Sequence, residues 1–432
     1  MENWSTLPSC QRALRFFGLW PTETLAPLYL CRTVAILGLH AYYVIYFAVM
    51  PFWQGTDKML YSYSYIIIAS TALHRVVMIP VKKKQIMRLC SDMERNYTSM
   101  EPDNLGSSVS RKTRDSIKTF CTWYMWRQTV VMAFWCMGYV MSILYDLCVK
   151  GTPYSEIKKE LPYGVHYSFD WEASPAFELL FVFEMLQITT IIYTISISDC
   201  TLFTIVAHIS GQLQALIAKI QLEEMEERKT DSASCVQTTT GSSRENIKKI
   251  RTKIDVECTT NNSSRKQENC RHKDEQFLHH IITHHNEIYR FADSFEQMCS
   301  TMLYIKFFAT TFFLCLTAYM VSISLDSPGS ICRFMSWALY ESNILYNYCR
   351  LGEQLTGWSL RVNDALFYLS WQDKSVAFKE TCWIMMVRAQ RPIILKAGPF
   401  YTLSFPSFRK ILESSYSYLM VLLQMNKKLY RV

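Results

Sequence analysis

The sequence lacks the motifs that mark a soluble enzyme. It contains no phosphate-binding loop, no nucleophile elbow and no pair of catalytic carboxylates in a soluble domain. His279, His280, His284 and His285 have helical spacing, but the order His-His-Asn-Glu differs from the HExxH pattern of zinc proteases. A solvated helix face explains these histidines better than a metal site. We therefore expect no enzyme activity, no metal and no cofactor.

The sequence also lacks the features of a secreted, disulfide-rich protein. Its first 30 residues carry Arg12 and Arg15 and contain no apolar segment that ends at a signal cleavage site. The fifteen cysteines are an odd number, are scattered and form no CxxC pair, so we interpret most of them as small hydrophobic residues. A disulfide between Cys148 and Cys332, near the expected outer face, stays an open alternative.

Long apolar segments alternate with charged loops. Half of the 432 residues are hydrophobic and 14% are aromatic. A helix needs about 20 mainly apolar residues to cross a bilayer. The segments that meet this requirement are 34–53, 60–80, 122–147, 175–200, 301–325, 331–365 and the second half of 380–426. The sequence thus predicts an all-α membrane protein with seven transmembrane helices.

The distribution of basic residues predicts a cytoplasmic N-terminus. Lysines and arginines are dense in 82–118 and in 219–273, after the second and fourth spans, and sparse in the alternate loops. Basic loops remain in the cytoplasm, so this pattern follows topology and does not indicate nucleic-acid binding. The sequons at Asn96 and Asn262 and the basic tail at 427–431 favour the opposite orientation.

The last span is interrupted and unusually polar. Pro392 ends an apolar helix and Gly398 permits a turn, so the seventh element is expected to be split into a cytosolic half and a membrane half. The second half, from Leu403 to Met425, has the length of a membrane span but carries hydroxyl groups at 414–418. Polar groups at membrane depth are costly unless they face protein or water. This helix is better suited to line a pathway than to face lipid.

Several C-terminal motifs resemble one known family. They are Tyr348-Cys349-Arg350-Leu351-Gly352-Glu353, Trp371, Arg388-Ala389-Gln390-Arg391-Pro392, Ala397-Gly398, Phe408 and Ser415-Tyr416-Ser417-Tyr418. Over the last hundred residues the chain resembles the insect odorant receptors. The resemblance implies seven helices with a cytoplasmic N-terminus in the plasma membrane of a sensory neuron. It also implies that the chain is part of a ligand-gated, non-selective cation channel. The channel would be a tetramer formed with the odorant receptor co-receptor.

The pore is expected at the end of the last span. Val421, Gln424 and Met425 share one helix face by their spacing, and in the resembling family these positions match a hydrophobic gate and a polar filter ring. The resemblance also implies that Arg388, Gln390, Arg391 and Pro392 belong to an intracellular anchor that packs subunits together.

Ligand binding is expected in the outer half of the second, third, fourth and sixth spans, a location that comes from the resemblance. A small hydrophobic volatile needs an enclosed apolar cavity with few polar anchors. The expected lining is Tyr65, Phe134, Met137, Gly138, Met141, Phe183, Gln187, Tyr340 and Asn343. Glu184 and Asp199 are acids within the fourth span and are functional candidates whose role stays open.

The expected organisation has five parts. Residues 1–33 form a cytosolic or interfacial N-terminus, and 34–222 hold spans one to four with the ligand-binding part. Residues 223–275 form a disordered cytosolic insertion, because 229–273 is polar and of low complexity. Residues 276–376 hold spans five and six, and 377–432 hold the anchor helix and the pore-lining span. The family usually has a shorter loop at the insertion, whose function stays open.

Three other classes remain as alternatives. A gustatory receptor-type channel ends in a similar run but usually has Phe after the glutamine, where this chain has Met425. A G-protein-coupled receptor requires an external N-terminus and glycosylated sequons. A membrane enzyme or transporter lacks support, because neither a catalytic arrangement nor an inverted repeat is visible. The insertion and the tail depart from the co-receptor itself, so we interpret the chain as an odorant-tuned subunit.

Overall fold

The computed structural model describes residues 27–49, 56–100, 104–151, 161–163, 169, 171–240, 254–324, 328–371 and 374–429. Residues 1–26 of the expected interfacial segment 1–33 therefore lie outside the described residues. The side chains of Asn96, Asn262 and the basic tail are also outside the description.

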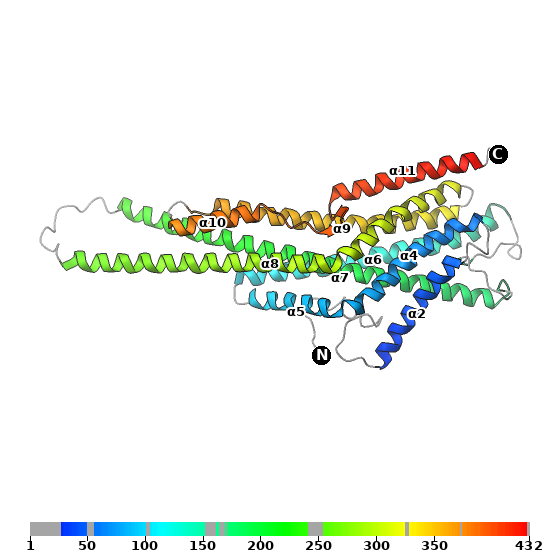
Figure 1. Cartoon of the computed structure of the whole chain (residues 1–432), viewed down its shortest axis with the longest axis horizontal. Coiled ribbons are helices and arrows are strands. Elements are labelled where there is room, and N and C mark those ends of the chain that lie inside the picture. The colour runs from blue at the N-terminus through cyan, green and yellow to red at the C-terminus, as the bar shows by residue number, and fades with distance from the viewer. Residues whose placement is uncertain are drawn as a thin grey trace.

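The described chain is almost entirely helical (Figure 1). Its helices are α2 Pro27–Val49, α4 Thr56–Val81, α5 Lys83–Met100, α6 Asn104–Cys148, α7 Ala176–Thr240, α8 Ile254–Ile323, α9 Pro328–Tyr368, α10 Val376–Ala389 and α11 Phe405–Leu429. A short antiparallel hairpin, β1 Lys396–Ala397 and β2 Tyr401–Thr402, joins α10 to α11. The prediction of an all-α membrane protein is confirmed, and the seventh element is split into α10 and α11. Helix α5 is additional to the expected spans.

Four helices in the described part of the chain are long and apolar enough to cross a membrane. The candidate segments are Ser62–Val81, Arg111–Cys148, Ala176–Glu226 and Arg271–Ile323, and Thr33–Val49 is a shorter apolar helix. Helices α9 and α11 fall outside this set because polar residues interrupt their apolar sequence. Such helices are stable in a membrane when their polar groups face protein or water.

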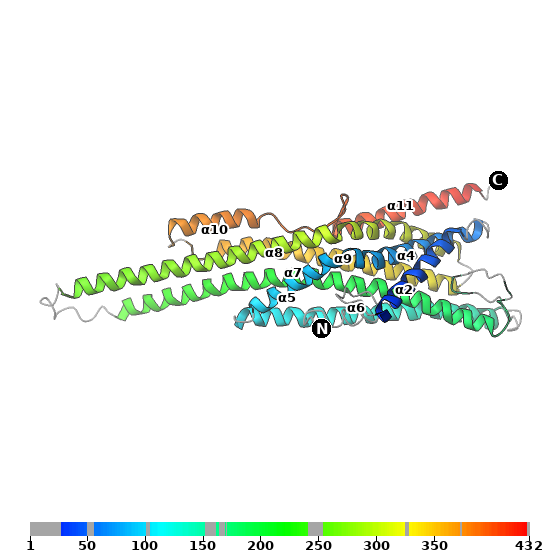
Figure 2. The same ribbon diagram turned by 60° about the horizontal axis from the view of Figure 1, so that its bottom comes forward.

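The molecule is elongated. Helices α7 and α8 extend far beyond the rest of the bundle at one end, with α10 beside α8, and α11 lies toward the other end (Figure 1, Figure 2). These extensions continue through α7 to Thr240 and resume in α8 from Ile254. The expected insertion, residues 223–275, thus has a helical backbone in 223–240 and 254–275, where the sequence suggests disorder. Residues 241–253 lie outside the described residues.

Helix α9 is the centre of the bundle. It packs against α6, α7, α8, α10 and α11. At Gly352 the chain after the hairpin comes so close that an added Cβ would lie 2.1 Å from the carbonyl oxygen of Leu403. Gly398 has a φ of 65°, the left-handed conformation that the sequence suggests for this turn. Gly352 thus allows the start of α11 to lie against α9, and Gly398 lies against the Tyr304 side chain of α8.

Candidate ligand site and pore-facing helix

Helix α11 contacts the bundle along one narrow face. Ser407, Ile411 and Ser415 follow one another at intervals of four residues and are buried. The Ser415 hydroxyl donates a hydrogen bond of 2.9 Å to the carbonyl oxygen of Thr311 in α8. Figure 1 and Figure 2 both show α11 at the edge of the bundle.

The three residues expected at the pore are exposed and lie near the C-terminal end of α11. Val421 is 53% exposed and Met425 is 56% exposed, and Gln424 is exposed as well. An apolar surface of this kind within a membrane protein faces lipid, a hydrated pathway or another chain. The pore assignment itself stays a prediction.

Hydrogen bonds hold the link between α10 and α11 against the bundle. The backbone NH of Ile393 donates to the Ser359 hydroxyl of α9 at 3.0 Å, and the NH of Gly398 donates to the Ser300 hydroxyl of α8 at 3.0 Å. The NH of Phe405 donates to the Glu353 carboxylate at 3.3 Å. These bonds tie the link and the first turn of α11 to both α8 and α9.

The expected anchor residues lie where α10 ends on α8. The Arg388 guanidinium sits 4.4 Å from the centre of the Tyr289 ring, and the Tyr289 hydroxyl donates to the carbonyl oxygen of Arg391 at 2.7 Å. Arg388, Gln390 and Arg391 lie at the end of α10 together with Pro392, which is half-buried. Their part in subunit packing stays a prediction.

Helix α10 also presents an apolar face that sequence reasoning missed. Val376, Trp383, Ile384 and Val387 are all exposed on it. Because apolar residues occur on every side of α10, its sequence gives no sign of which side packs in the chain and which side remains uncovered.

Three of the expected ligand-binding residues lie inside the bundle. The Tyr65 ring stacks on Phe47 at 5.2 Å and meets Tyr163 and Trp337 edge-on, at 5.1 and 5.8 Å. Tyr340, one turn after Trp337, is buried beside Ser196, with 3.5 Å between the hydroxyl oxygens. The third is Gln187.

Gln187 is buried without a hydrogen-bond partner among the described residues. Its side chain is 2% exposed, and neither the amide nitrogen nor the amide oxygen is satisfied. The hydroxyl of Thr194, two turns further along α7, is buried in the same state. A buried amide without a partner is costly and rare, so it marks a place where a ligand or a water is expected.

The other expected ligand-binding residues are placed differently. Phe134, Met137 and Met141 of α6 and Phe183 of α7 are exposed on the outside of the bundle. Gly138 is buried against the Arg333 side chain of α9. Asn343 is half-buried, and its side-chain oxygen accepts a bond of 2.6 Å from Asn347. The structure does not bring these residues together with Tyr65, Gln187 and Tyr340.

Sequence reasoning also missed Tyr163, which lies in the described part of the connection between α6 and α7. It is buried against Tyr43, Phe47 and Tyr65. Its backbone NH donates to the Glu184 carboxylate at 2.8 Å, which gives that acid a structural role. No periodicity marks a loop residue of this kind.

Further along α7 from this aromatic cluster, Asp199 is the centre of a buried polar network. It forms an ion pair with Arg75 of α4 and accepts hydrogen bonds from Tyr348 of α9 and from Tyr124 of α6, the latter at 3.2 Å. Arg75 is 2% exposed and Asp199 is fully buried. Paired charges are the form in which ionised groups persist inside a membrane protein.

A second buried ion pair joins α8 to α9. The Lys306 ammonium lies 2.6 and 2.8 Å from the two carboxylate oxygens of Glu341, and Thr310 donates to the same carboxylate at 3.1 Å. Arg75 and Lys306 were missed by the sequence analysis, although a lone cation inside an apolar segment is a visible signal.

Cys148 and Cys332, both among the described residues, are free thiols and are not joined by a disulfide. The Cys332 thiol lies 3.5 Å from the carbonyl oxygen of Phe134. Within the described ranges, no group of three or more histidine, cysteine or acidic side chains is arranged to hold a metal ion.

Comparison with known proteins decides the family. The model of the 7tm Odorant receptor family matches residues 55–416, which is most of the chain. The chain belongs to the 7tm Odorant receptor family. It is therefore a multi-pass protein of the plasma membrane, and the resemblance inferred from the C-terminal motifs is confirmed.

Individual odorant receptors match over a shorter length. Odorant receptor 67a of Drosophila melanogaster is 26% identical over 141 residues, which cover 33% of this chain and 34% of that protein. Odorant receptor Or2 of Anopheles gambiae is 22% identical over 145 residues, 34% of this chain and 38% of that protein. The matched region thus spans about a third of the length of these relatives.

A solved structure matches over almost the whole chain. The olfactory receptor OR5 from Machilis hrabei, in complex with eugenol, superimposes with a TM-score of 0.69 at 15% sequence identity. The superposition covers 98% of this chain and 100% of OR5, so the two chains share the same seven-helix fold.

Proposed function

We propose that this odorant receptor is the odorant-binding subunit of a ligand-gated, non-selective cation channel that assembles with the odorant receptor co-receptor as a heterotetramer. The observation that carries the proposal is the uncovered face of α11, with Val421 and Met425 more than half exposed. A helix held on one side only, together with the exposed apolar face of α10 at the other end of the molecule, is suited to assembly with other subunits.

The face of α11 supplies what a narrow cation pore needs. Around a central axis, Val421 and Met425 form an apolar ring that excludes water when the ring is tight, and Gln424 offers an uncharged polar group to a hydrated ion. Opening requires the C-terminal part of α11 to move away from the axis.

The ligand proposed for this chain is a small hydrophobic volatile with one hydrogen-bonding group. The aromatic rings of Tyr65, Tyr163 and Trp337 offer apolar contact, and the unsatisfied amide of Gln187 offers both a donor and an acceptor. OR5 of Machilis hrabei was solved with eugenol, which fits this chemistry.

A continuous set of contacts links this site to α11. Tyr340 and Tyr348 lie on α9, and Tyr348 bonds Asp199. The Phe307 ring lies 6.2 Å from the Tyr348 ring and 5.9 Å from the Tyr401 ring of β2, just before α11. A ligand that binds better when α9 is displaced favours the open arrangement of α11 by the same free energy.

Recording currents tests the proposal. Cells that express this chain with the co-receptor are expected to respond to some members of a panel of volatiles, and cells that express either chain alone are expected to lack those responses. Gln424→Glu places a charge in the ring, so it is expected to change the relative permeability to Na⁺ and Ca²⁺. Silence of the pair despite verified surface delivery, or unchanged permeability in the variant, contradicts the proposal.

A further inference from the structure

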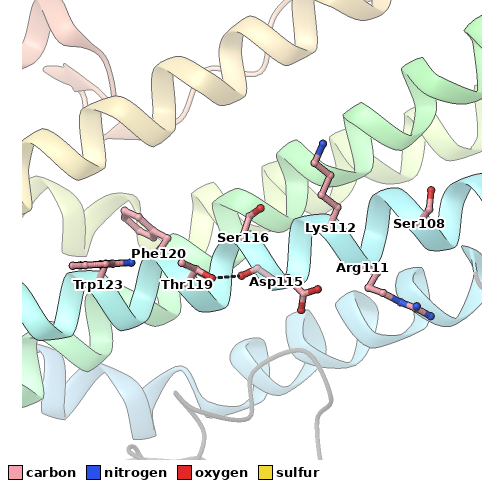
Figure 3. Close-up of a pocket in the computed structure, with 8 residues that line it drawn as sticks. All are labelled: Ser108, Arg111, Lys112, Asp115, Ser116, Thr119, Phe120 and Trp123. Carbon is pink, nitrogen blue, oxygen red and sulfur yellow. Dashed lines mark hydrogen bonds between the residues drawn. The ribbon is translucent and has the colours of Figure 1, made fainter.

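The cytoplasmic part of α6 borders an open hollow of about 800 Å³. Every lining residue that the structure describes belongs to α6 (Figure 3). Arg111 and Lys112 lie toward one end of this stretch, and Phe120 and Trp123 lie at the other (Figure 3). At about 1.5 Å per residue, the hollow follows the helix for some 24 Å.

The hollow lies where the membrane meets the cytoplasm. The basic residues from 111 to 118 are on the side that the charge distribution places in the cytoplasm, and the apolar span begins near 122. Trp123 and Trp126 are both more than half exposed, and tryptophan is enriched at the level of the lipid headgroups. One end of the hollow is therefore in water and the other end is beside lipid.

Two cations line the hollow, and a third, Arg350, lies against its lining residue Phe120. Arg111 and Lys112 are exposed, and neither makes a hydrogen bond or an ion pair with the described residues. Arg350 of α9 is half-buried with its guanidinium 5.0 Å from the centre of the Phe120 ring, and it has no carboxylate partner in the described chain. Asp115 is the one acid among the lining residues, so positive charge dominates.

An apolar surface continues from the hollow along α6. Phe134, Met137 and Met141 are exposed, and their spacing places them on the same side of α6 as Trp123. A lipid with its headgroup in the hollow would thus place its hydrocarbon chain on this surface.

We propose that the hollow binds an anionic phospholipid of the inner leaflet. Lys112 and Arg350 contact the phosphate, the Ser116 hydroxyl donates to it, and Trp123 packs on the glycerol and the first acyl carbons. A free phosphate or a soluble headgroup lacks the hydrocarbon that the apolar surface receives, so its binding would be much weaker. The site lies apart from both the ligand site and α11.

Native mass spectrometry of the full-length receptor purified in detergent tests this site. Phosphatidylserine and phosphatidylcholine with the same acyl chains are offered together. We expect phosphatidylserine to be retained about tenfold more strongly, and the variant R111Q/K112Q/R350Q to lose this preference. The matched control R271Q/K273Q removes two exposed cations from the far extension of α8 and is expected to keep it.

Two further arms make the result decisive. R111Q/K112Q alone changes only exposed side chains, so it is expected to fold and to lower the tenfold preference for phosphatidylserine to about twofold, because one of the three cations remains. Soluble glycerophosphoserine is expected not to displace the lipid. Unchanged preference in R111Q/K112Q, equal loss in R271Q/K273Q, or displacement by the soluble headgroup overturns the proposal.

Discussion

Helices α9 and α11 both carry polar side chains inside a membrane protein, but they use them differently. On α9, Glu341 is paired with Lys306 and Tyr348 is bonded to Asp199, so its polar groups are satisfied within the chain. On α11, the exposed Ser417 bonds only to its own helix, and Gln424 lies uncovered. Polar groups that are satisfied inside the chain hold the fold together, whereas Ser417 and Gln424 of α11 are exposed to water or to another subunit.

The largest effect is expected at the buried network. Asp199→Asn removes the charge that pairs with Arg75, which leaves a buried cation uncompensated and costs about 3–5 kcal/mol in the free energy of unfolding. Thermal unfolding of the purified receptor and its surface expression measure this loss. Asp146→Asn, which breaks a solvent-accessible pair with Lys150, is the control and is expected to change the unfolding temperature far less. Equal losses in the two variants would contradict the comparison.

The second ion pair provides a double-mutant test. Lys306→Met or Glu341→Met alone strands one buried charge and is expected to cost about 3 kcal/mol in the free energy of unfolding. The double variant is expected to recover most of this cost, because no charge remains to be desolvated. Additive losses, seen by thermal unfolding of all three variants, would show that the pair does not act as a unit.

A smaller effect, with opposite signs in two assays, is expected at Gln187. Gln187→Leu removes a buried amide without partners, so the ligand-free receptor is expected to gain about 1–3 kcal/mol in stability. The same variant is expected to respond about tenfold more weakly to volatiles with a hydrogen-bonding group and equally to pure hydrocarbons. Dose–response curves measure the second effect, with the outward-facing Leu186→Ala as control. A uniform loss for both ligand classes would remove Gln187 from the site.

The smallest effect on folding is expected on the free face of α11. Val421→Ala is expected to change the free energy of unfolding by less than about 0.5 kcal/mol, because the side chain makes few contacts within the chain. Ile411→Ala, on the buried face of the same helix, is expected to cost about 2–5 kcal/mol. Thermal unfolding of the two variants compares the faces directly, and similar values would mean that both faces are packed in the chain.

Much of this architecture is predictable from the sequence, for physical reasons. The spans are long apolar segments, Pro392 and Gly398 mark the break in the seventh element, and the spacing of Val421, Gln424 and Met425 places them on one face. Helical spacing of this kind is a local property and survives in the folded chain.

The facing of α6 is not predictable in the same way. Its membrane part is apolar all round, because lipid and protein core accept the same residues. The expected ligand residues Phe134, Met137 and Met141 are exposed for this reason. The partners of Asp199 and Glu341 also depend on contacts between distant helices, and a single sequence does not contain them. The helical backbone of α7 up to Thr240 likewise departs from the polar, low-complexity composition of that segment.

Thiol accessibility at Val421 tests most directly whether the free face of α11 borders the ion pathway. Val421→Cys receptors, expressed with the co-receptor, are treated with a charged, water-soluble thiol reagent during recording, and the unsubstituted pair controls for native cysteines. If this face borders the pathway, ligand-evoked current is blocked irreversibly, and the block is faster when ligand is present during treatment. Full current after treatment would contradict a place for this face beside the ion pathway. This holds if the introduced thiol is labelled without effect and also if it stays unlabelled in the open state.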